Sequence, residues 1–403
     1  MKRIFICFTI LSSFLFPQTQ IFLQITKNLM EKANVYLIFK IDKNDFSEKL
    51  INTLSDDLKY SGFFNILGFK IVDEIEKIKK EILTQVIIIG EKKKEIINIK
   101  VEEGLEGKII FEKDYKLIEP RYLAHTISDD IVEKLTGKQG IAKSKIIFAS
   151  DKTGKRQIYM IDYDGFNLKQ ITDVDYLINY PRYFKENEIL FVSYQDGYPK
   201  ISKIDIISKK IQDFLSKPGL NACISVCRET KEIAVVLSYF GNPEIFVVDF
   251  NGNIKRRITN YKGIDSSPSF SPDGKNIAFV SDRHGKPQIY LMDKDGYGVK
   301  RISYISNYCT SPTFSPDGNF IAYIYSDGSG YGLAIYDINT EKTKTIPGLN
   351  CEEISWAPDS RHIVYSKTGE KEPLMIIDIY TKNTRKLISG NFKFLSPCWF
   401  ILE

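Results

Sequence analysis

One segment pattern returns six times along the C-terminal two thirds of the chain, at intervals of 41–44 residues. Aligning the copies places one large apolar residue at the same point of each copy, and an aspartate that ends an apolar run forms a second column with the same period. A repeat of this length is typical of a β-propeller or a repeat array, in which each unit buries its apolar faces against its neighbours. The two columns are Tyr183, Val226, Phe270, Phe314, Trp356 and Trp399, and Asp162, Asp205, Asp249, Asp293, Asp337 and Asp378.

Each copy contains four strand candidates joined by turns. In "SPDG" (271–274 and 315–318), proline presets φ at the second turn position and glycine supplies the positive φ that closes the hairpin. The second and third strands, such as "NIAFVS" and "IFVV", are apolar on both faces, so both faces of each sheet must be covered. Four-stranded sheets stacked around an axis meet this requirement. The predicted fold class is therefore an all-β six-bladed β-propeller, preceded by a small α/β domain.

The two ends of the repeat indicate how the ring closes. The first copy begins at "KIIFAS" without the short strand that opens the others, and the last short strand, "LSPCWF", is followed by no further copy. Pairing this C-terminal strand with the first copy completes six blades and removes the open sheet edges. Trp399 would then take in blade one the place that Phe270 has in blade four. The alternative is an open β-solenoid with an unpaired half-blade at each end.

The first residues of the chain resemble an export signal. Residues 1–19 have a short cationic head and then an apolar run of roughly a dozen residues, too short to span a bilayer. This layout predicts a signal peptide with an uncertain cleavage point. A buried N-terminal strand is the alternative.

A small α/β domain is predicted on residues 20–139, before a propeller on residues 144–403. Its sequence contains several strand patterns and two amphipathic helix patterns. The first helix has Asp45 as its predicted N-cap, and the second runs from Pro120 to a close at Gly137.

Charge and cysteine content exclude several classes of function. The net charge of +5 is modest and spread along the chain, so no segment is basic enough to indicate nucleic-acid binding. The run "EKKKE" (91–95) is interpreted as a solvated hairpin tip. Outside the predicted signal peptide, five cysteines remain without C-x-x-C spacing, which argues against a zinc site and a full disulfide framework. The six aspartates of the second column are expected to cap turns, because they lie in separate blades and cannot share one ion.

Four segments together resemble the TolB family, the periplasmic component of the Tol–Pal system. They are "LSDDLKYSGFFNIL", the helix-to-propeller junction "AHTISDDIVEKLTGKQGIAKSKIIFAS", the repeat "SPSFSPDGKNIAFVSDRHGKPQIYLMD" and the terminal "SPCWF". The resemblance covers essentially the whole chain after the signal peptide, in the family's order. Blades two and three depart from it, because "ENEILFVSYQDGYPKISKID" and "CRETKE" lack the Pro-Asp-Gly turn.

The resemblance implies a non-catalytic interaction hub in the periplasm that supports outer-envelope integrity and cell division. It implies binding of a Pal-like peptidoglycan-associated lipoprotein through the propeller. It also implies binding of a TolA-like inner-membrane protein through the segment after the signal peptide, here Gln20, Ile21 and Phe22. We expect a monomer without cofactor or metal, without nucleic-acid binding and without direct membrane insertion.

The predicted Pal-like site lies where loops converge near the propeller axis. Loops from one blade's outer strand to the next blade's inner strand share a face with the loops between second and third strands, and they can grip one partner together. Their polar and aromatic residues suit hydrogen bonding and anchoring. The candidate contacts are Asn179, Tyr180, Asn221, Asp265, Ser266, Arg283, His284, Tyr308, Thr310, Asn350, Glu352, Glu353, Lys393 and Phe394.

Two other functions stay open at this point. One is a propeller scaffold for another envelope partner, and the other is a propeller enzyme with a site in its channel. A propeller that gates a serine peptidase would need a G-x-S-x-G motif, which the sequence lacks. An enzyme with its site in the channel would need clustered histidines or pairs of acidic residues. The three histidines, His125, His284 and His362, fall in separate elements.

Overall fold

The computed structural model describes residues 31–104, 106–369 and 373–402. The predicted signal peptide and the predicted TolA-like contacts, Gln20, Ile21 and Phe22, lie outside the described residues. The described residues divide into two compact units, with the boundary between Lys138 and Gln139. None of the described helices combines the length and the apolar character needed to cross a bilayer.

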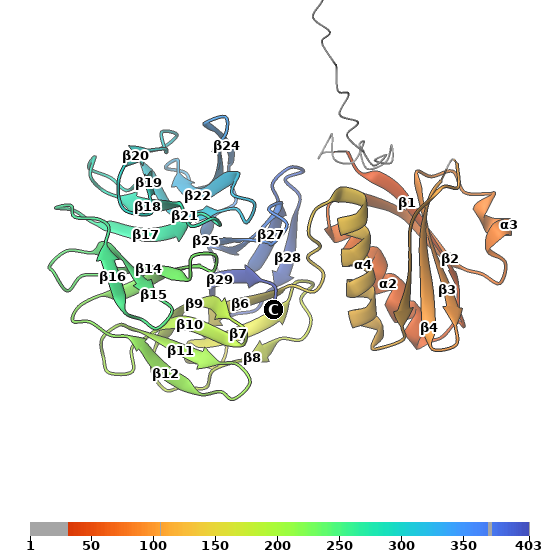
Figure 1. Ribbon diagram of the computed structural model, residues 1–403, viewed down its shortest axis with the longest axis horizontal. Helices are drawn as coiled ribbons and strands as arrows, with labels where there is room; N and C mark the ends of the chain where they lie inside the picture. Colours follow the sequence, from red (N-terminus) through yellow and green to blue (C-terminus); the bar gives the residue numbers. More distant parts are fainter. Residues whose placement is uncertain (1–30, 105, 370–372, 403) are drawn as a thin grey trace, which may run out of the picture. The chain divides into compact units, whose positions relative to one another are not determined.

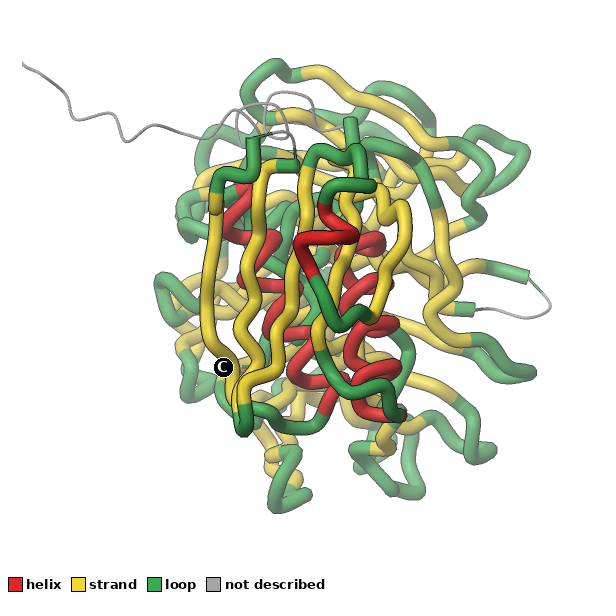
Figure 2. Tube along the Cα trace, turned by 90° about the vertical axis from the view of Figure 1, so that its right-hand side faces the viewer, coloured by secondary structure: helices red, strands yellow, loops and turns green. Residues whose placement is uncertain are grey.

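The N-terminal unit is a five-stranded sheet with helices on both faces. The strand order is β2-β1-β3-β4-β5, in which β1, β2 and β3 run parallel and β4 and β5 are antiparallel additions. Figure 2 shows these strands side by side with long helices behind them. The elements are β1 (Ala33–Lys40), α2 (Asp45–Tyr60), β2 (Phe64–Ile71), α3 (Ile75–Lys79), β3 (Val86–Lys93), β4 (Ile96–Glu103), β5 (Ile109–Lys116) and α4 (Pro120–Thr136).

Alternating side chains of the sheet form two separate cores. Leu37 and Phe39 of β1 face α2 and α4 and pack with Leu54 in the main core. Ile38 points the other way and packs against the short helix α3 through Ile75. Figure 1 shows α2 and α4 on one side of the sheet and α3 on the other. This alternation follows from the period of two along a strand.

Three details of this unit differ from the sequence prediction, the first of which is the short third helix α3, where only two helices were predicted. The N-cap of α2 is Asn44, whose Oδ1 accepts the N–H of Ser47 at 3.0 Å while the Ser47 hydroxyl oxygen accepts the Asn44 N–H, a reciprocal cap. Asp45 is instead the first residue of the helix, where its charge suits the helix dipole. Strand β2 was not predicted, because its sequence "FNILGFKI", which follows the predicted helix end at Gly62, contains Asn65 and Gly68, residues that weaken a strand pattern. The second helix begins at Pro120 and its left-handed cap is Gly137, as predicted.

The C-terminal unit is a six-bladed β-propeller, as predicted, with four strands in each blade (Figure 1). The second and third strands of the blades are largely buried on both faces. The innermost strands are β29 (Phe394–Phe400), β9 (Ile178–Lys185), β13 (Asn221–Cys227), β17 (Asp265–Phe270), β21 (Tyr308–Phe314) and β25 (Cys351–Trp356). The second strands are β6 (Lys145–Ser150), β10 (Glu188–Ser193), β14 (Glu232–Leu237), β18 (Asn276–Ser281), β22 (Phe320–Ser326) and β26 (His362–Lys367). The third strands are β7 (Gln157–Asp162), β11 (Lys200–Asp205), β15 (Glu244–Asp249), β19 (Gln288–Asp293), β23 (Tyr331–Asp337) and β27 (Leu374–Asp378). The outer strands are β8 (Lys169–Gln170), β12 (Ile211–Leu215), β16 (Ile254–Arg257), β20 (Lys300–Arg301), β24 (Lys342–Ile346) and β28 (Thr384–Ile388).

The C-terminal strand closes the ring in the predicted way. Strand β29 pairs antiparallel with β6, so the first blade has the order β29-β6-β7-β8. The indole of Trp399 is buried, and its Nε1–H donates to the Ser144 hydroxyl at 2.7 Å. The ring of Phe400 stacks on that of Tyr183 in the next blade, with centroids 4.2 Å apart. The first blade is therefore tied to its neighbour by the last residues of the chain.

The aspartate column has the structural role expected of it. In Asp249, Oδ1 accepts the backbone N–H groups of Asn251 and Asn253 at 2.9 Å each, and Asp293 does the same in the next blade. The hydrogen bond from the Asn253 side chain, together with those from the turn N–H groups, favours the ionised carboxylate and lowers the pKa of Asp249. These carboxylates hold the turns on the face opposite the predicted partner site.

Candidate functional site: the axial face and channel

The innermost strand of every blade carries an irregularity, at equivalent positions in five blades and slightly nearer the start of the strand, between Cys351 and Glu353, in blade six. Its pairing with the second strand shifts register by one residue, as in a β-bulge. In five blades a non-glycine residue there has a positive φ, which is uncommon for such residues. These residues are Tyr180, Cys223, Ser267, Ser311 and Ser396, and Glu353 occupies the same place in the sixth blade. A bulge redirects side chains, and here it bends all six inner strands where they border the axis.

These strands enclose a channel of about 410 Å³ along the propeller axis, called the axial channel below. Most of its wall consists of serine, threonine, proline and cysteine residues. Its charged residues are Arg182, Arg228 and Glu353. The guanidinium of Arg228 lies over the ring of Tyr183, 4.4 Å from the centroid, and its Nε–H donates to the Phe184 carbonyl at 3.2 Å. The channel is therefore a polar site of low charge density, suited to hydrogen bonding with a protein segment.

Glu353 has a second role beside its place in the channel. Its carboxylate accepts the backbone N–H of Ser396, and it accepts the Ser396 hydroxyl at 3.0 Å. Ser396 belongs to the closing strand β29, so Glu353 links blade six to blade one. Burial of the phenol, helped by the nearby Glu353 carboxylate, raises the pKa of Tyr180 to about 12. Tyr180 therefore presents a neutral hydroxyl to the channel at physiological pH.

The predicted contact residues fall into three groups in the structure. Tyr180, Thr310 and Glu353 line the axial channel. Eight others lie on or near the loops around its mouth, and we call this rim with its loops the axial face. They are Asn179, Ser266, Arg283, His284, Tyr308, Asn350, Glu352 and Lys393, of which His284, Tyr308, Asn350, Glu352 and Lys393 are exposed.

Three predicted contacts are buried and support the loops from within. Asn221 is 0% exposed, and its amide donates to the carbonyls of Pro199 and Lys217. Asp265 is also fully buried, and Phe394 is 1% exposed with its ring against Phe148. Sequence reasoning placed all three on an accessible loop because each begins an inner strand. We correct this: their side chains offer no surface to a partner.

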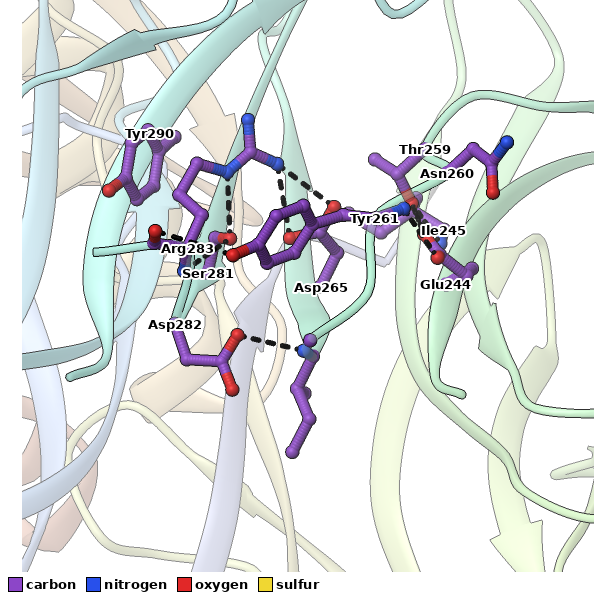
Figure 3. A network of polar contacts seen from close by, with 12 residues as sticks. Glu244, Ile245, Thr259, Asn260, Tyr261, Asp265, Ser281, Asp282, Arg283 and Tyr290 are labelled. Atoms are coloured by element: carbon purple, nitrogen blue, oxygen red, sulfur yellow. Dashed lines mark hydrogen bonds and ion pairs between the residues drawn. The ribbon is translucent and has the colours of Figure 1, made fainter. Parts of the chain in front are cut away.

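Asp265 is the centre of a polar network that fixes two loops of the axial face (Figure 3). The Arg283 guanidinium donates to both carboxylate oxygens, at 3.2 and 3.0 Å, and its Nε–H donates to the Ser281 hydroxyl at 2.9 Å. The same guanidinium lies 4.8 Å from the ring centroid of Tyr290 and 5.2 Å from that of Tyr261. Burial raises the pKa of Asp265, although hydrogen bonds and Arg283 oppose this shift. Arg283 is thus a positioning residue of the loop.

A column of polar residues that sequence reasoning missed holds the same loops. The Glu244 carboxylate accepts the Thr259 hydroxyl at 2.5 Å and the Tyr261 N–H at 2.8 Å, and the Thr259 hydroxyl oxygen accepts the Ile245 N–H. Blade four repeats this arrangement with Gln288 and Ser303. Gln157, Glu244 and Gln288 stand at the period of the repeat, so a third aligned column could have found them. Loops held in this way lose little freedom when a partner binds.

Other kinds of site have little support in the described part of the chain. There, no three histidine, cysteine or acidic side chains gather where they could hold a metal ion. His284 Nδ1 lies 2.5 Å from the Tyr290 hydroxyl, and His362 Nδ1 lies 2.6 Å from Asp359. These histidines belong to separate blades and form no cluster.

The fold and this face define a closed six-bladed β-propeller with a polar axial channel, joined to an N-terminal α/β unit. Residues 132–402 match the family model described as TolB beta propeller domain. The chain belongs to this family.

Similar proteins carry the same family name. "Protein TolB homolog" of Chlorobium chlorochromatii is 35% identical over 150 residues, or 36% of this chain and 34% of that protein. "Tol-Pal system protein TolB" of Desulfotalea psychrophila is 30% identical over 158 residues, or 38% of this chain and 36% of that protein. The chain thus spans about a third of the length of these curated relatives in the matched segments. The crystal structure of TolB from Acinetobacter baumannii superposes with a TM-score of 0.81 at 25% identity, over 92% of this chain and 96% of that one.

Proposed function

We propose that this protein is a non-catalytic, periplasmic interaction hub of a Tol–Pal system. The observation that carries the proposal is the likeness to TolB from Acinetobacter baumannii, because it extends over both the α/β unit and the propeller. The curated relatives named as Tol-Pal system proteins support the same role. In this role the protein would support outer-envelope integrity and cell division without catalysing a reaction.

We further propose that the axial face and channel bind a Pal-like lipoprotein. Three features of the site support this. Its loops are held by buried hydrogen bonds, its rim exposes aromatic and charged side chains such as Tyr308 and Glu352, and its channel offers hydroxyl groups. Aromatic anchors within a polar rim are typical of protein–protein interfaces.

The first test uses the double variant Glu352→Lys with Tyr308→Ala. Both side chains are exposed, so we expect an unchanged unfolding midpoint and at least about tenfold weaker binding of the soluble domain of the cognate Pal-like lipoprotein. Calorimetric titration measures the affinity. Tyr297→Ala is the matched control, because Tyr297 is 73% exposed on a turn at the opposite end of the strands. Unchanged affinity for every axial-face variant would contradict this placement.

The second test concerns the proposed TolA-like contact of Gln20, Ile21 and Phe22. Removal of residues 18–24 is expected to abolish binding of the cognate TolA-like protein and to leave binding of the Pal-like domain largely intact. Pull-down with each purified partner gives the two measurements. Equal loss of both would show that the two contacts are not divided between the N-terminal segment and the propeller.

A further inference from the structure

The N-terminal unit has a hollow of its own, far larger than the axial channel. It has a volume of about 980 Å³, near the upper end of the range of about 300–1,000 Å³ typical of small-ligand sites. Its wall comes from the carboxyl ends of β1 and β2, the first turns of α2 and the β3–β4 hairpin. We call it the switch-point crevice, because the chain changes direction across the sheet at this point.

The crevice lies where the chain changes direction across the sheet. Strand β1 is followed by α2, which packs on one face of the sheet and leads to β2. Strand β2 is followed by α3, which packs on the opposite face and leads to β3 on the far side of β1. The loops that leave β1 and β2 therefore diverge to opposite faces. In open sheets with parallel strands, ligands bind in the crevice that this divergence leaves at the carboxyl ends of the strands.

A β-bulge in β2 brings an aromatic ring into the crevice. The pairing of β1 with β2 shifts by one residue, from Val35 with Ile66 to Tyr36 with Gly68, so Phe69 pairs with Leu37. Leu37 faces the core beneath α2, and Phe69 shares that side. Without the extra residue, Phe69 would pair with the oppositely directed Ile38. The bulge thus turns Phe69 towards α2, where it lines the crevice and stays 41% exposed.

Two partly exposed ion pairs lie at the crevice. The Lys92 ammonium lies 2.7 Å from the Asp42 carboxylate, which joins the hairpin to the loop after β1. Lys40 at the end of β1 lies 3.2 Å from Glu91. The hydrogen bond from Lys92 lowers the pKa of Asp42, so the pair stays charged at neutral pH. Two of the three lysines of the hairpin, Lys92 and Lys94, therefore form part of the crevice wall.

Four further charged side chains line the crevice and form no ion pair within the described residues. Lys43 and Lys94 are cationic, and Glu48 and Asp73 are anionic. The apolar part of the lining includes Phe69 with Ile41, Ile71 and Val72. A ligand that matches this surface carries both signs of charge and one large apolar group.

We propose that the switch-point crevice binds a short zwitterionic peptide with an aromatic or large aliphatic side chain. The apolar side chain packs on Phe69. The peptide carboxylate pairs with Lys43 and Lys94, and the peptide ammonium pairs with Glu48 or Asp73. This site is separate from the axial face and does not depend on the proposed Tol–Pal role.

The test uses the full chain and the tripeptide alanine–4-fluorophenylalanine–alanine with free ends, observed by ¹⁹F NMR. We expect saturable line broadening with a Kd of about 1 mM or tighter. Phe69→Ala and the double variant Lys43→Glu with Lys94→Glu should each weaken binding at least about tenfold, and so should acetylation and amidation of the peptide ends. All three residues are exposed, so the unfolding midpoint should stay unchanged in each variant.

Matched controls make each outcome decisive. Leu67→Ala removes a 49% exposed side chain from the same strand outside the crevice, and Lys344→Glu reverses an exposed lysine of the propeller. Both controls should bind the peptide as the natural chain does. The proposal is overturned if the peptide does not bind, if the crevice variants and the controls bind equally well, or if the capped peptide binds as tightly as the free one.

Discussion

Trp399→Ala is expected to lower the free energy of unfolding of the propeller by about 3–5 kcal/mol, the usual cost of removing a buried indole. Trp399 is 6% exposed, so the substitution leaves a cavity in the first blade. It also removes the 2.7 Å hydrogen bond from the indole to Ser144, whose own hydroxyl donates to the Ile141 carbonyl. Denaturant unfolding followed by circular dichroism measures the change.

Comparison with Trp356 separates ring closure from ordinary core packing. Trp356 holds the same place in blade six, is 4% exposed and donates its indole N–H to the Thr313 carbonyl at 3.0 Å. Trp356→Ala should therefore cost a similar free energy. Hydrogen exchange should distinguish the two variants, because only Trp399→Ala lies on the strand that latches the ring. We expect faster exchange in β29 and β6 for Trp399→Ala alone. Equal exchange in both variants would show that closure does not depend on Trp399.

Much of the propeller follows from the sequence, because each blade repeats the same physical requirements. The repeat period, the strands apolar on both faces and the unmatched terminal strand together favour a closed ring of six blades over an open β-solenoid. Strand β2 of the α/β unit could not be predicted in this way. No repeat marks it, and Asn65 and Gly68 interrupt its apolar residues.

The axial face could be predicted as a set of loops but not residue by residue. Asp265 and Glu352 both stand near the beginning of an inner strand, yet Asp265 is fully buried and Glu352 is exposed. The difference comes from Arg283, which lies 18 positions later and reaches back to Asp265 across the hairpin. Single-sequence patterns do not show which acidic residue is buried in this way. The bulge that turns Phe69 towards α2 is hidden in the same way, because it depends on strand pairing.

Asp265→Ala is expected to lower the free energy of unfolding by about 3 kcal/mol, because it leaves the Arg283 guanidinium without its carboxylate inside the fold. This value lies at the low end of the range for breaking buried pairs, since the Arg283 side chain is 19% exposed and reaches some water. Charge reversal at Asp265 would lower the free energy of unfolding, so a loss of partner binding in that variant would not by itself show that Asp265 contacts the partner. Thermal and denaturant unfolding of the full chain measure the effect.

A double-mutant cycle with Arg283→Met identifies the cause of that loss. Arg283→Met removes the cation as well, while its unbranched chain can still pack near Tyr261 and Tyr290. The double variant should therefore be more stable than Asp265→Ala alone. Glu341→Ala, which breaks the exposed pair with Lys300, should change stability by less than about 1 kcal/mol. Additive effects of Asp265→Ala and Arg283→Met would mean that the two residues stabilise the loops independently, and that the network of Figure 3 does not act as a unit.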